Sequence, residues 1–233
     1  MKQAQNKGEE FLSMNTIEEA LPLFQQIMDL ICITFGENCE VTLHDWSKGY
    51  EHSIVAIKNG HVTKRQVGDC GSNLGLEIMR GKIEGGNRFN YMTKTSCGQM
   101  LKSSTIYLTN DNGETIGALC VNIDITEALD FQKSFASFIG AETVSQIETP
   151  AESIEFHANN VGQLTDFLIS QSLELVNKPS DQLTKEDKMT ILKFLDEKGL
   201  FLITKSGDKV CQFLNISKFT FYNYLEMIRG EKE

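Results

Sequence analysis

Four side chains near the C-terminus have chemical types that suit contact with the edges of DNA bases. They are Lys218, Phe219, Tyr222 and Asn223. Their spacing puts them on one outward face of a helix if the apolar residues between them face inward. An amide can hydrogen-bond base edges, an aromatic ring can contact a thymine methyl group, and an ammonium can bind phosphate. The pattern therefore predicts a helix that enters the major groove.

Two short helices with a tight turn are needed to hold that face outward, and we predict them over residues 205–226. Asn215 is at the turn, because Asn tolerates the left-handed backbone required there. Ser217 is the predicted N-cap of the second helix. The inward positions are apolar: Val210, Cys211, Leu214, Ile216, Phe221, Tyr224 and Leu225. The predicted DNA contacts are Lys205, Ser217, Lys218, Phe219, Thr220, Tyr222, Asn223 and Arg229. The alternative is a helical hairpin packed on a core.

The charge of the chain limits what kind of DNA binding is plausible. Over 233 residues, 22 basic and 32 acidic side chains give a net charge of -10, which argues against nonspecific coating of nucleic acid. From Lys205 to Arg229 the basic residues outnumber the acidic ones, which favours specific, salt-sensitive contact with one operator. A single copy would neutralise few phosphates, so we predict a homodimer or a higher homo-oligomer on double-stranded DNA.

Other classes of protein are disfavoured by what the sequence lacks. No apolar run approaches the ~18 residues that cross a bilayer, and the N-terminus has no hydrophobic signal segment, so we expect a cytoplasmic protein without membrane contact. The six cysteines include no CxxC pair. This spacing predicts free thiols and no metal site.

The first half alternates strand and helix patterns in the order of a sensor domain. A helix is predicted over 17–35, then strands at 39–45 and 53–59, with Asn59-Gly60 turning into a hairpin at His61-Val62. A short helix over 73–80 precedes strands at 89–94, 100–109 and 115–125 and a helix at 127–139. We therefore predict an α+β chain whose N-terminal domain is a PAS-like antiparallel five-stranded sheet with flanking helices.

The second half is predicted to be an all-α helix-turn-helix domain. The Ser/Thr-rich stretch around Pro150 indicates a linker at 140–158, which divides a domain at 1–139 from a helical domain at 159–233. Helical spacing covers 161–176, and Thr184 with Asp187 forms a capping box for a further helix that stops at Gly199.

Polar residues at strand ends are candidates for a small-molecule site in the first domain. They are His44, Asp45, Ser104, Asn122 and Asp124. Asn122 and Asp124 share a strand face and could together hold an amine, hydroxyl or guanidinium group, with Ser104 assisting. The alternative is that these residues cap loops or face water. No cofactor is indicated, although a small-molecule effector remains open.

An enzyme would need an activated nucleophile, and Cys97 or Cys70 with His44 or His61 would be the pair. Nothing in the spacing brings such a pair together. We therefore predict no catalytic residues.

Long ordered segments of this chain resemble one family of bacterial transcriptional regulators. In the first half these are ENCEVTLHD at 37–45, HSIVAIKNGHVTKRQVGD at 52–69, LKSSTIYL at 101–108 and IGALCVNIDIT at 116–126; in the second they span 183–225. The sequence resembles a YheO-like PAS domain followed by a DauR-like helix-turn-helix, as in repressors of the D-arginine utilisation type. The resemblance implies a regulator whose first domain senses or dimerises and controls operator binding by the second. Asn215 and Phe221 depart from the usual Gly and β-branched residue, which puts the tightness of the turn in question. The alternative function is a metabolite-binding or protein-interaction module without DNA binding.

Overall fold

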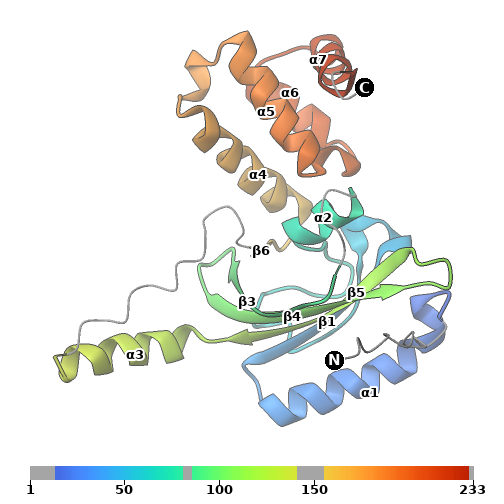
Figure 1. Ribbon diagram of the computed structural model, residues 1–233, viewed down its shortest axis with the longest axis vertical. Coiled ribbons are helices and arrows are strands. Elements are labelled where there is room, and N and C mark those ends of the chain that lie inside the picture. The colour runs from blue at the N-terminus through green and yellow to red at the C-terminus, as the bar shows by residue number, and fades with distance from the viewer. Residues whose placement is uncertain (1–13, 81–85, 141–154, 231–233) are drawn as a thin grey trace, which may run out of the picture.

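A computed structural model describes residues 14–80, 86–140 and 155–230 and shows a curved sheet beside a group of helices (Figure 1). The chain is α+β, with the sheet in the N-terminal part and the helices α4 to α7 in the C-terminal part. The helices are α1 (Ile17–Phe35), α2 (Asn73–Met79), α3 (Thr126–Phe138), α4 (Val161–Val176), α5 (Lys185–Glu197), α6 (Ser206–Leu214) and α7 (Lys218–Gly230). The strands are β1 (Cys39–Asp45), β2 (Ile54–Lys58), β3 (Arg88–Thr95), β4 (Met100–Thr109), β5 (Thr115–Asp124) and β6 (Glu155–His157).

The described sheet has six strands, so the prediction of five strands is wrong. Its order is β2-β1-β5-β4-β3-β6, and β6 pairs parallel to β3 while all other pairs are antiparallel. Residues 155–157 were predicted to lie in the linker at 140–158, most of which lies outside the described residues. A strand of three residues is too short to show a period of two, and its partner strand is far away in the sequence.

The predicted hairpin after β2 is also wrong. Asn59 adopts the left-handed backbone (φ 53°) that the Asn-Gly signal indicates. However, residues 60–64 continue as turns and add no strand to the sheet. Val62 bonds back to the Asn59 carbonyl at 3.0 Å, and Arg65 bonds to the Gly60 carbonyl at 3.0 Å. The segment carries Thr63 and Arg65 under the sheet, where both are buried.

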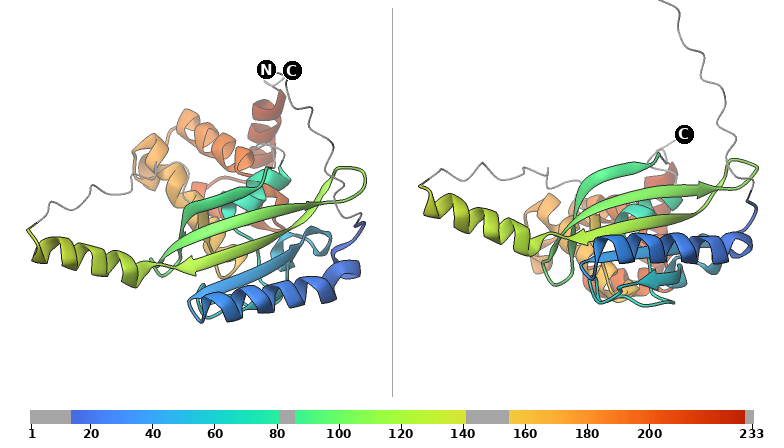
Figure 2. Two further views of the ribbon diagram at one scale, coloured as in Figure 1. Left: turned by 60° about the horizontal axis from the view of Figure 1, so that its bottom comes forward. Right: turned by 90° about the horizontal axis from the view of Figure 1, so that it is seen from below.

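The two faces of the sheet differ in chemistry because β1 alternates strictly. Val41 and Leu43 face α1, which lies across one side of the sheet and packs Phe24 and Met28 there (Figure 2). Glu40, Thr42 and His44 have the opposite parity and are also buried. The inner face therefore carries polar groups that must be hydrogen-bonded within the protein.

The helical domain has a continuous apolar core that includes residues next to β6. Leu164, Leu168, Ile191, Leu192 and Leu195 of α4 and α5 are fully buried in it. The Thr184–Asp187 capping box is formed at the start of α5, as predicted. β6 also contributes to this core: the Phe156 ring stacks on Phe167 with centroids 4.1 Å apart, and the neighbouring Ala158 is buried there.

Helix α3 projects away from both the sheet and the helical domain (Figures 1 and 2). None of its residues is buried. Phe131, Phe135 and Phe138 are 70%, 52% and 86% exposed. One face of this helix is thus apolar and is not covered by the residues that the structure describes.

Among the described residues, no helix has the length and apolar character of a membrane span.

Candidate functional site

The turn between α6 and α7 forms as its residues dictate. Asn215 adopts the left-handed conformation (φ 48°) and ends α6, and the Ile216 N–H bonds to the Cys211 carbonyl at 3.0 Å. The Ser217 hydroxyl accepts the Thr220 backbone N–H at 3.1 Å, which caps α7. The predictions for the turn and the N-cap are confirmed, and Asn tolerates the position where Gly is common.

Close packing fixes the angle between the two helices. The Phe221 ring lies edge-on to Phe201, with centroids 5.1 Å apart. A Cβ added at Gly207 would lie 3.2 Å from the Phe221 ring, tighter than an ordinary contact. The sequence prediction identified Cys211 as the small residue near the crossing, and Gly207 is a second one. Phe221, where a β-branched residue was expected, thus fits because Gly207 leaves it room.

The outward face of α7 presents two aromatic rings to solvent. Phe219 is 77% exposed and Tyr222 is 65% exposed. Lys218 and Ser217 are exposed, while Thr220 and Asn223 are half-buried at the edges of this face. Lone exposed apolar residues are common, but an aromatic pair beside an amide and an ammonium is a surface suited to binding. We name Lys218, Phe219, Tyr222 and Asn223 the α7 face.

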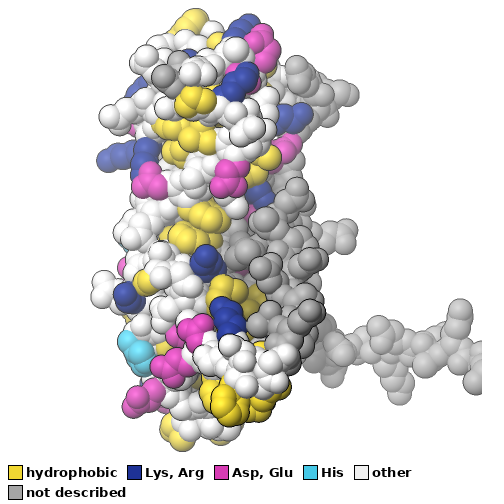
Figure 3. Space-filling model, turned by 90° about the vertical axis from the view of Figure 1, so that its left-hand side faces the viewer, with side chains coloured by type: hydrophobic (Ala, Val, Ile, Leu, Met, Phe, Trp, Pro, Cys, Tyr) yellow, Lys and Arg dark blue, Asp and Glu magenta, His cyan; other side chains and the backbone are white. Residues whose placement is uncertain are grey.

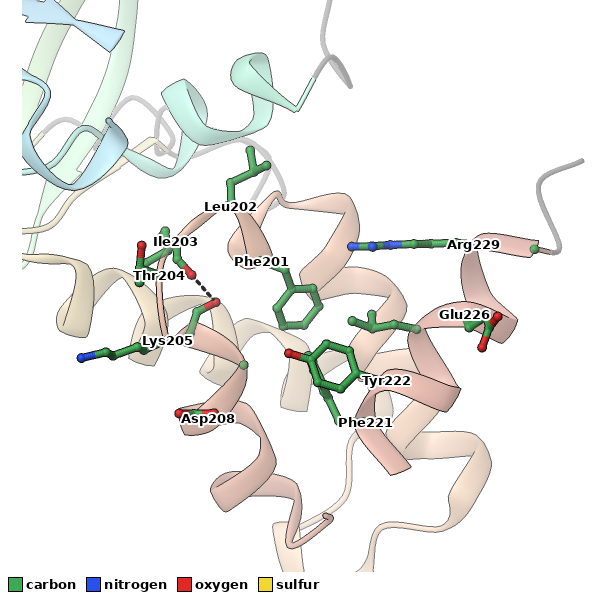
Figure 4. Close-up of a pocket in the computed structure, with 14 residues that line it drawn as sticks. Phe201, Leu202, Ile203, Thr204, Lys205, Asp208, Phe221, Tyr222, Glu226 and Arg229 are labelled. Carbon is green, nitrogen blue, oxygen red and sulfur yellow. Dashed lines mark hydrogen bonds between the residues drawn. The ribbon is translucent and has the colours of Figure 1, made fainter. Parts of the chain in front are cut away.

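A groove of about 930 Å³ runs beside this face, between α7 and the segment 201–208. Figure 4 shows Phe201 and Tyr222 across this groove, with Arg229 at the far end of α7. Lys205 lies at its other wall, is exposed, and has a left-handed backbone (φ 62°) before α6. The α7 face is therefore bordered by a channel rather than by packed protein.

Most of the basic residues near the α7 face are already paired with acids. Lys218 Nζ lies 2.7 Å from Asp208 Oδ1, and Lys209 Nζ lies 2.7 Å from Asp166 Oδ1. Both pairs are exposed, so each is weak and can exchange its acid for a phosphate. Among the residues that the structure describes, Lys205 has no acidic group within 4.0 Å.

Arg229, which the sequence predicts as a DNA contact, instead binds the buried Asp196. Its Nη2 lies 2.6 Å from Asp196 Oδ1, while Arg80, the C-cap of α2, places Nη2 2.8 Å from Asp196 Oδ2. Hydrogen bonds to the two guanidinium groups outweigh burial and hold the pKa of Asp196 below its ordinary value. One carboxylate therefore joins the sensor-side helix α2 to the C-terminal end of α7. We name Arg80, Asp196 and Arg229 the arginine joint.

The five residues predicted to bind a small molecule do not come together. Asp45 accepts the Ser47 N–H at 2.9 Å, and Asp124 accepts the Thr126 N–H at 2.9 Å, so both cap turns. The Ser104 hydroxyl on the interior strand β4 accepts the Asn90 N–H of β3 at 3.0 Å. Asp124 also receives Gln99 Nε2 at 2.8 Å. Asp45 and Asp124 therefore follow the alternative given for them, the capping of loops, whereas Ser104 bonds the neighbouring strand.

Asn122 and His44 face the inner side of the sheet, but with partners other than those predicted. Ser103, not Ser104, lies opposite Asn122, and its hydroxyl donates to Asn122 Oδ1 at 2.8 Å. Ser104 lies opposite Val121 and so has the other parity. His44 Nδ1 lies 3.1 Å from the Ser53 hydroxyl, and burial lowers the pKa of His44 to about 3.

Near His44 the structure has a small, partly open cavity between the sheet and α2. Its volume is about 20 Å³, room for about one water molecule. Its charged and imidazole-bearing lining residues are His44, Arg65, Glu155 and His157. Sequence reasoning missed the last three, because each is positioned by a turn or by β6 rather than by a periodic element.

Among the described residues no hydrogen bond joins Cys70 or Cys97 to His44 or His61, although hydrogen bonds, with Lys64 first among them, outweigh partial burial and lower the pKa of the Cys97 thiol. Burial raises the pKa of the Cys70 thiol to about 11, so Cys70 stays protonated at neutral pH. Cys97 is exposed on the turn after β3, and His61 is exposed on the turn after β2. His44 hydrogen-bonds Ser53 and is held neutral by burial.

Comparison with known proteins agrees with this architecture. Residues 15–140 match the model of the YheO-like PAS domain, and residues 164–226 match an HTH domain. The chain belongs to the YheO-like PAS family. Its C-terminal helices are thus a helix-turn-helix domain, the class of fold that places a recognition helix in the major groove of DNA. Strand β6 lies between the two matched regions.

Three relatives match along nearly the whole chain. An uncharacterized protein of Haemophilus influenzae is 30% identical over 210 residues, which is 90% of this chain and 91% of that protein. The uncharacterized protein YheO of Escherichia coli is 27% identical over 91% of this chain and 86% of its own length. The transcriptional regulator DauR of Pseudomonas aeruginosa is 24% identical over 91% of this chain and 96% of its own length. Both domains and their order are therefore shared.

Proposed function

We propose that this protein is a DNA-binding transcriptional regulator, in which the PAS-like domain controls how α7 engages an operator. The observation that carries the proposal is the α7 face, with Phe219 77% and Tyr222 65% exposed beside Lys218 and Asn223. The capped N-terminus of α7 adds free backbone N–H groups that suit a phosphate. The HTH match and the similarity to the transcriptional regulator DauR support the same conclusion.

A second copy of the chain is the partner that this surface needs. The protein is acidic overall and offers few unpaired basic groups near α7, so one copy makes few phosphate contacts. The apolar face of α3, with Phe131, Phe135 and Phe138 uncovered, suits packing against the same helix of a second copy. Hydrophobic side chains also gather in the lower part of the surface in Figure 3, on the side from which α3 projects. Replacing Phe131 and Phe138 with Ser should give monomers in analytical ultracentrifugation.

The route from sensor to α7 runs through α2 and β6. The helix that follows the sheet in the chain, α3, projects away from the helical domain (Figure 1). Two ion pairs instead join α2 to the helical domain: Arg80 with Asp196 at 2.8 Å and Lys198 with Glu77 at 3.0 Å. Gly199 also packs against the Leu76 backbone. A shift of α2 would therefore move the arginine joint and, with it, the C-terminal end of α7.

Fluorescence anisotropy with the DNA upstream of the protein's own gene tests the proposal. Asn223→Ala should weaken binding by about 1–3 kcal/mol and relax sequence selectivity, as loss of a base contact does. Lys218→Ala should weaken binding to all sequences and lower the salt dependence by about one ion. Lys58→Ala on β2 also removes one acid-paired lysine, outside the HTH domain and outside α3, and should leave the affinity unchanged.

The competing function is a metabolite-binding or protein-interaction module without DNA binding. The groove beside α7 would then hold a partner segment. Absence of any salt-sensitive, sequence-selective binding by the native protein would reject DNA reading and leave this second function.

A further inference from the structure

A chain of hydrogen bonds crosses the inner face of the sheet and fixes where each proton lies. It begins at Glu40, whose carboxylate is bound by Arg65 Nη2 at 2.8 Å with both side chains fully buried. Asn122 Nδ2 donates to Glu40 at 3.0 Å, since a paired carboxylate can only accept. This leaves Asn122 Oδ1 to accept from the Ser103 hydroxyl at 2.8 Å.

The same logic continues to β6 and sets the tautomer of His157. The Ser103 hydroxyl donates its proton to Asn122. In the 2.8 Å hydrogen bond between Thr93 and Ser103, the Thr93 hydroxyl must therefore be the donor. Thr93 can then only accept from His157 Nε2, which lies 3.1 Å away. Burial, followed by the charge of Arg65, holds the pKa of His157 well below its ordinary value, so the ring is neutral. Nδ1 is therefore an unprotonated acceptor.

His157 Nδ1 and Glu155 Oε2 are both buried and have no hydrogen-bond partner among the described residues. Glu155 Oε1 accepts the Ser72 hydroxyl, so only the second oxygen is open. The hydroxyl of Tyr91 lies near Glu155 and opposes burial in setting the pKa of that carboxyl, while its 2.8 Å hydrogen bond is with the Thr105 hydroxyl. Two acceptors without donors thus lie two residues apart on β6, and both side chains line the same cavity.

When Glu155 is ionised the cavity has a net negative charge, which burial disfavours by raising the pKa of Glu155 and which a bound cation would balance. Arg65 is matched by Glu40, both histidines are neutral, and Glu155 remains. A metal ion does not suit this set: among the described residues, no group of three His, Cys, Asp or Glu side chains could hold one. Two acceptors and one negative charge instead complement a cation that has N–H donors.

We propose that Glu155 Oε2 and His157 Nδ1 bind the protonated amine of a small nitrogenous effector. A volume of about 20 Å³ admits an ammonium head group, which is about the size of a water molecule. The aromatic rings of Trp46, Tyr50 and Tyr107 line the remaining wall and suit a cation. The statement that the bound amine regulates DNA binding rests on the proposed function, whereas the statement that the cavity binds an amine does not.

The site would act on α7 through the elements that hold it. Alternate residues of β6 serve the two domains: Glu155 and His157 face the cavity, while Phe156 packs in the helical core. The Asn73 side chain at the start of α2 accepts the Phe156 N–H at 2.6 Å. Ser72, the N-cap of α2, lines the cavity, so the carbon chain of an effector would push against the start of α2, whose C-cap is Arg80 of the arginine joint.

Nitrogen NMR of the full-length protein, labelled in histidine, tests the site without DNA. Ammonium chloride replaces potassium chloride at constant total salt, so the charge and ionic strength stay fixed and only the N–H donors change. We expect an unprotonated Nδ1 of His157 in potassium and a saturable shift of its signal as ammonium is added. With one heavy atom in the ligand, Kd should be on the order of 0.1 M. A water molecule alone in the cavity would leave the signal unchanged and overturn the proposal, as would a proton found on Nδ1.

Two variants test whether the Glu155 carboxylate is the group that binds ammonium. Glu155→Gln keeps the shape of the side chain and should abolish the ammonium-dependent shift over the same range. Glu174→Gln on the exposed side of α4 is the matched control and should keep it. Because the wild-type titration needs no variant and no operator, it decides the site even if Glu155→Gln folds poorly or the protein binds no DNA.

Discussion

Glu155 and Asp196 are both buried carboxylates, but their surroundings differ in the number of charged donors. Asp196 lies between the guanidinium groups of Arg80 and Arg229, which bind both of its oxygens. Among the described residues no guanidinium or ammonium group hydrogen-bonds Glu155, whose one oxygen accepts the Ser72 hydroxyl, and burial raises its pKa above the ordinary value. A buried carboxylate with hydrogen-bond donors on both oxygens can link two structural elements, whereas one with an oxygen left without a donor can bind a ligand.

The largest expected effect on stability follows the removal of the Asp196 carboxylate, which has donors on both oxygens. Asp196→Ala leaves two arginines facing each other at the domain junction and should lower the free energy of unfolding by about 3 kcal/mol, the low end for broken buried pairs because both guanidinium groups are partly exposed. Urea unfolding measures it. Asp208→Ala, which breaks an exposed pair with Lys218, should cost less than about 1 kcal/mol. Equal losses for the two variants would mean that the joint contributes no more than a surface pair.

The two carboxylates should respond to pH with opposite sign. The folded pKa of Asp196 is lowered, so its stabilisation is present above the unfolded pKa and is lost as pH falls through the folded value. The folded pKa of Glu155 is raised, so its contribution is present below the unfolded pKa and is lost as pH rises through the folded value. Urea midpoints of wild type, Asp196→Asn and Glu155→Gln over a pH series would show this. Parallel curves for the two variants would contradict the assignment.

Glu155→Gln should raise the stability of the free protein at neutral pH by roughly 1 kcal/mol, because the buried charge without a second donor is removed. This is the smaller stability effect, and its sign is opposite to that of Asp196→Ala. Thermal and urea unfolding in potassium buffer measure it, since ammonium would stabilise the wild type by binding. A clear loss of stability would indicate that Glu155 already has a partner in the free protein.

The smallest effect concerns an exposed carboxylate beside the α7 face. Asp208→Asn frees Lys218 from its 2.7 Å ion pair and should strengthen operator binding by less than about tenfold. The number of counterions released on binding, measured from the salt dependence of the affinity, should rise by about one. Anisotropy titrations at several salt concentrations measure both. Asp166→Asn, which frees Lys209 farther from the α7 face, is the matched control and should change affinity less.

Elements with a strong period were predictable from the sequence. The bounds of α1 and α4 agree with the predicted ranges, because apolar residues at helical spacing and the caps Thr16 and Asn160 specify them locally. The turn at Asn215 and the cap at Ser217 agree for the same reason. Strand β6 was not predictable, because three residues carry no period and their hydrogen bonds come from β3.

In the candidate sites, too, positions set by local spacing were predictable and contacts between distant residues were not. The outward position of Phe219 and Tyr222 follows from helical spacing, so the sequence predicts it. The predicted role of Arg229 as a DNA contact did not anticipate Asp196, which lies on another helix. The predicted neighbour of Asn122 was Ser104, but the structure places Ser103 there. The register between two strands is set by all of their hydrogen bonds together and cannot be read from one strand.

The sequence by itself determined the helices, most strands, the helix-turn-helix and its solvent-facing side chains, because each depends on residues a few positions apart. Only the tertiary structure decided which polar groups meet across the sheet. Arg65 reaches Glu40, His157 reaches Thr93, and Asp196 joins Arg80 to Arg229 through contacts between residues 25, 64, 116 and 33 positions apart. Such contacts leave no local pattern in the chain, since a buried polar group is specified by its partner and not by its neighbours.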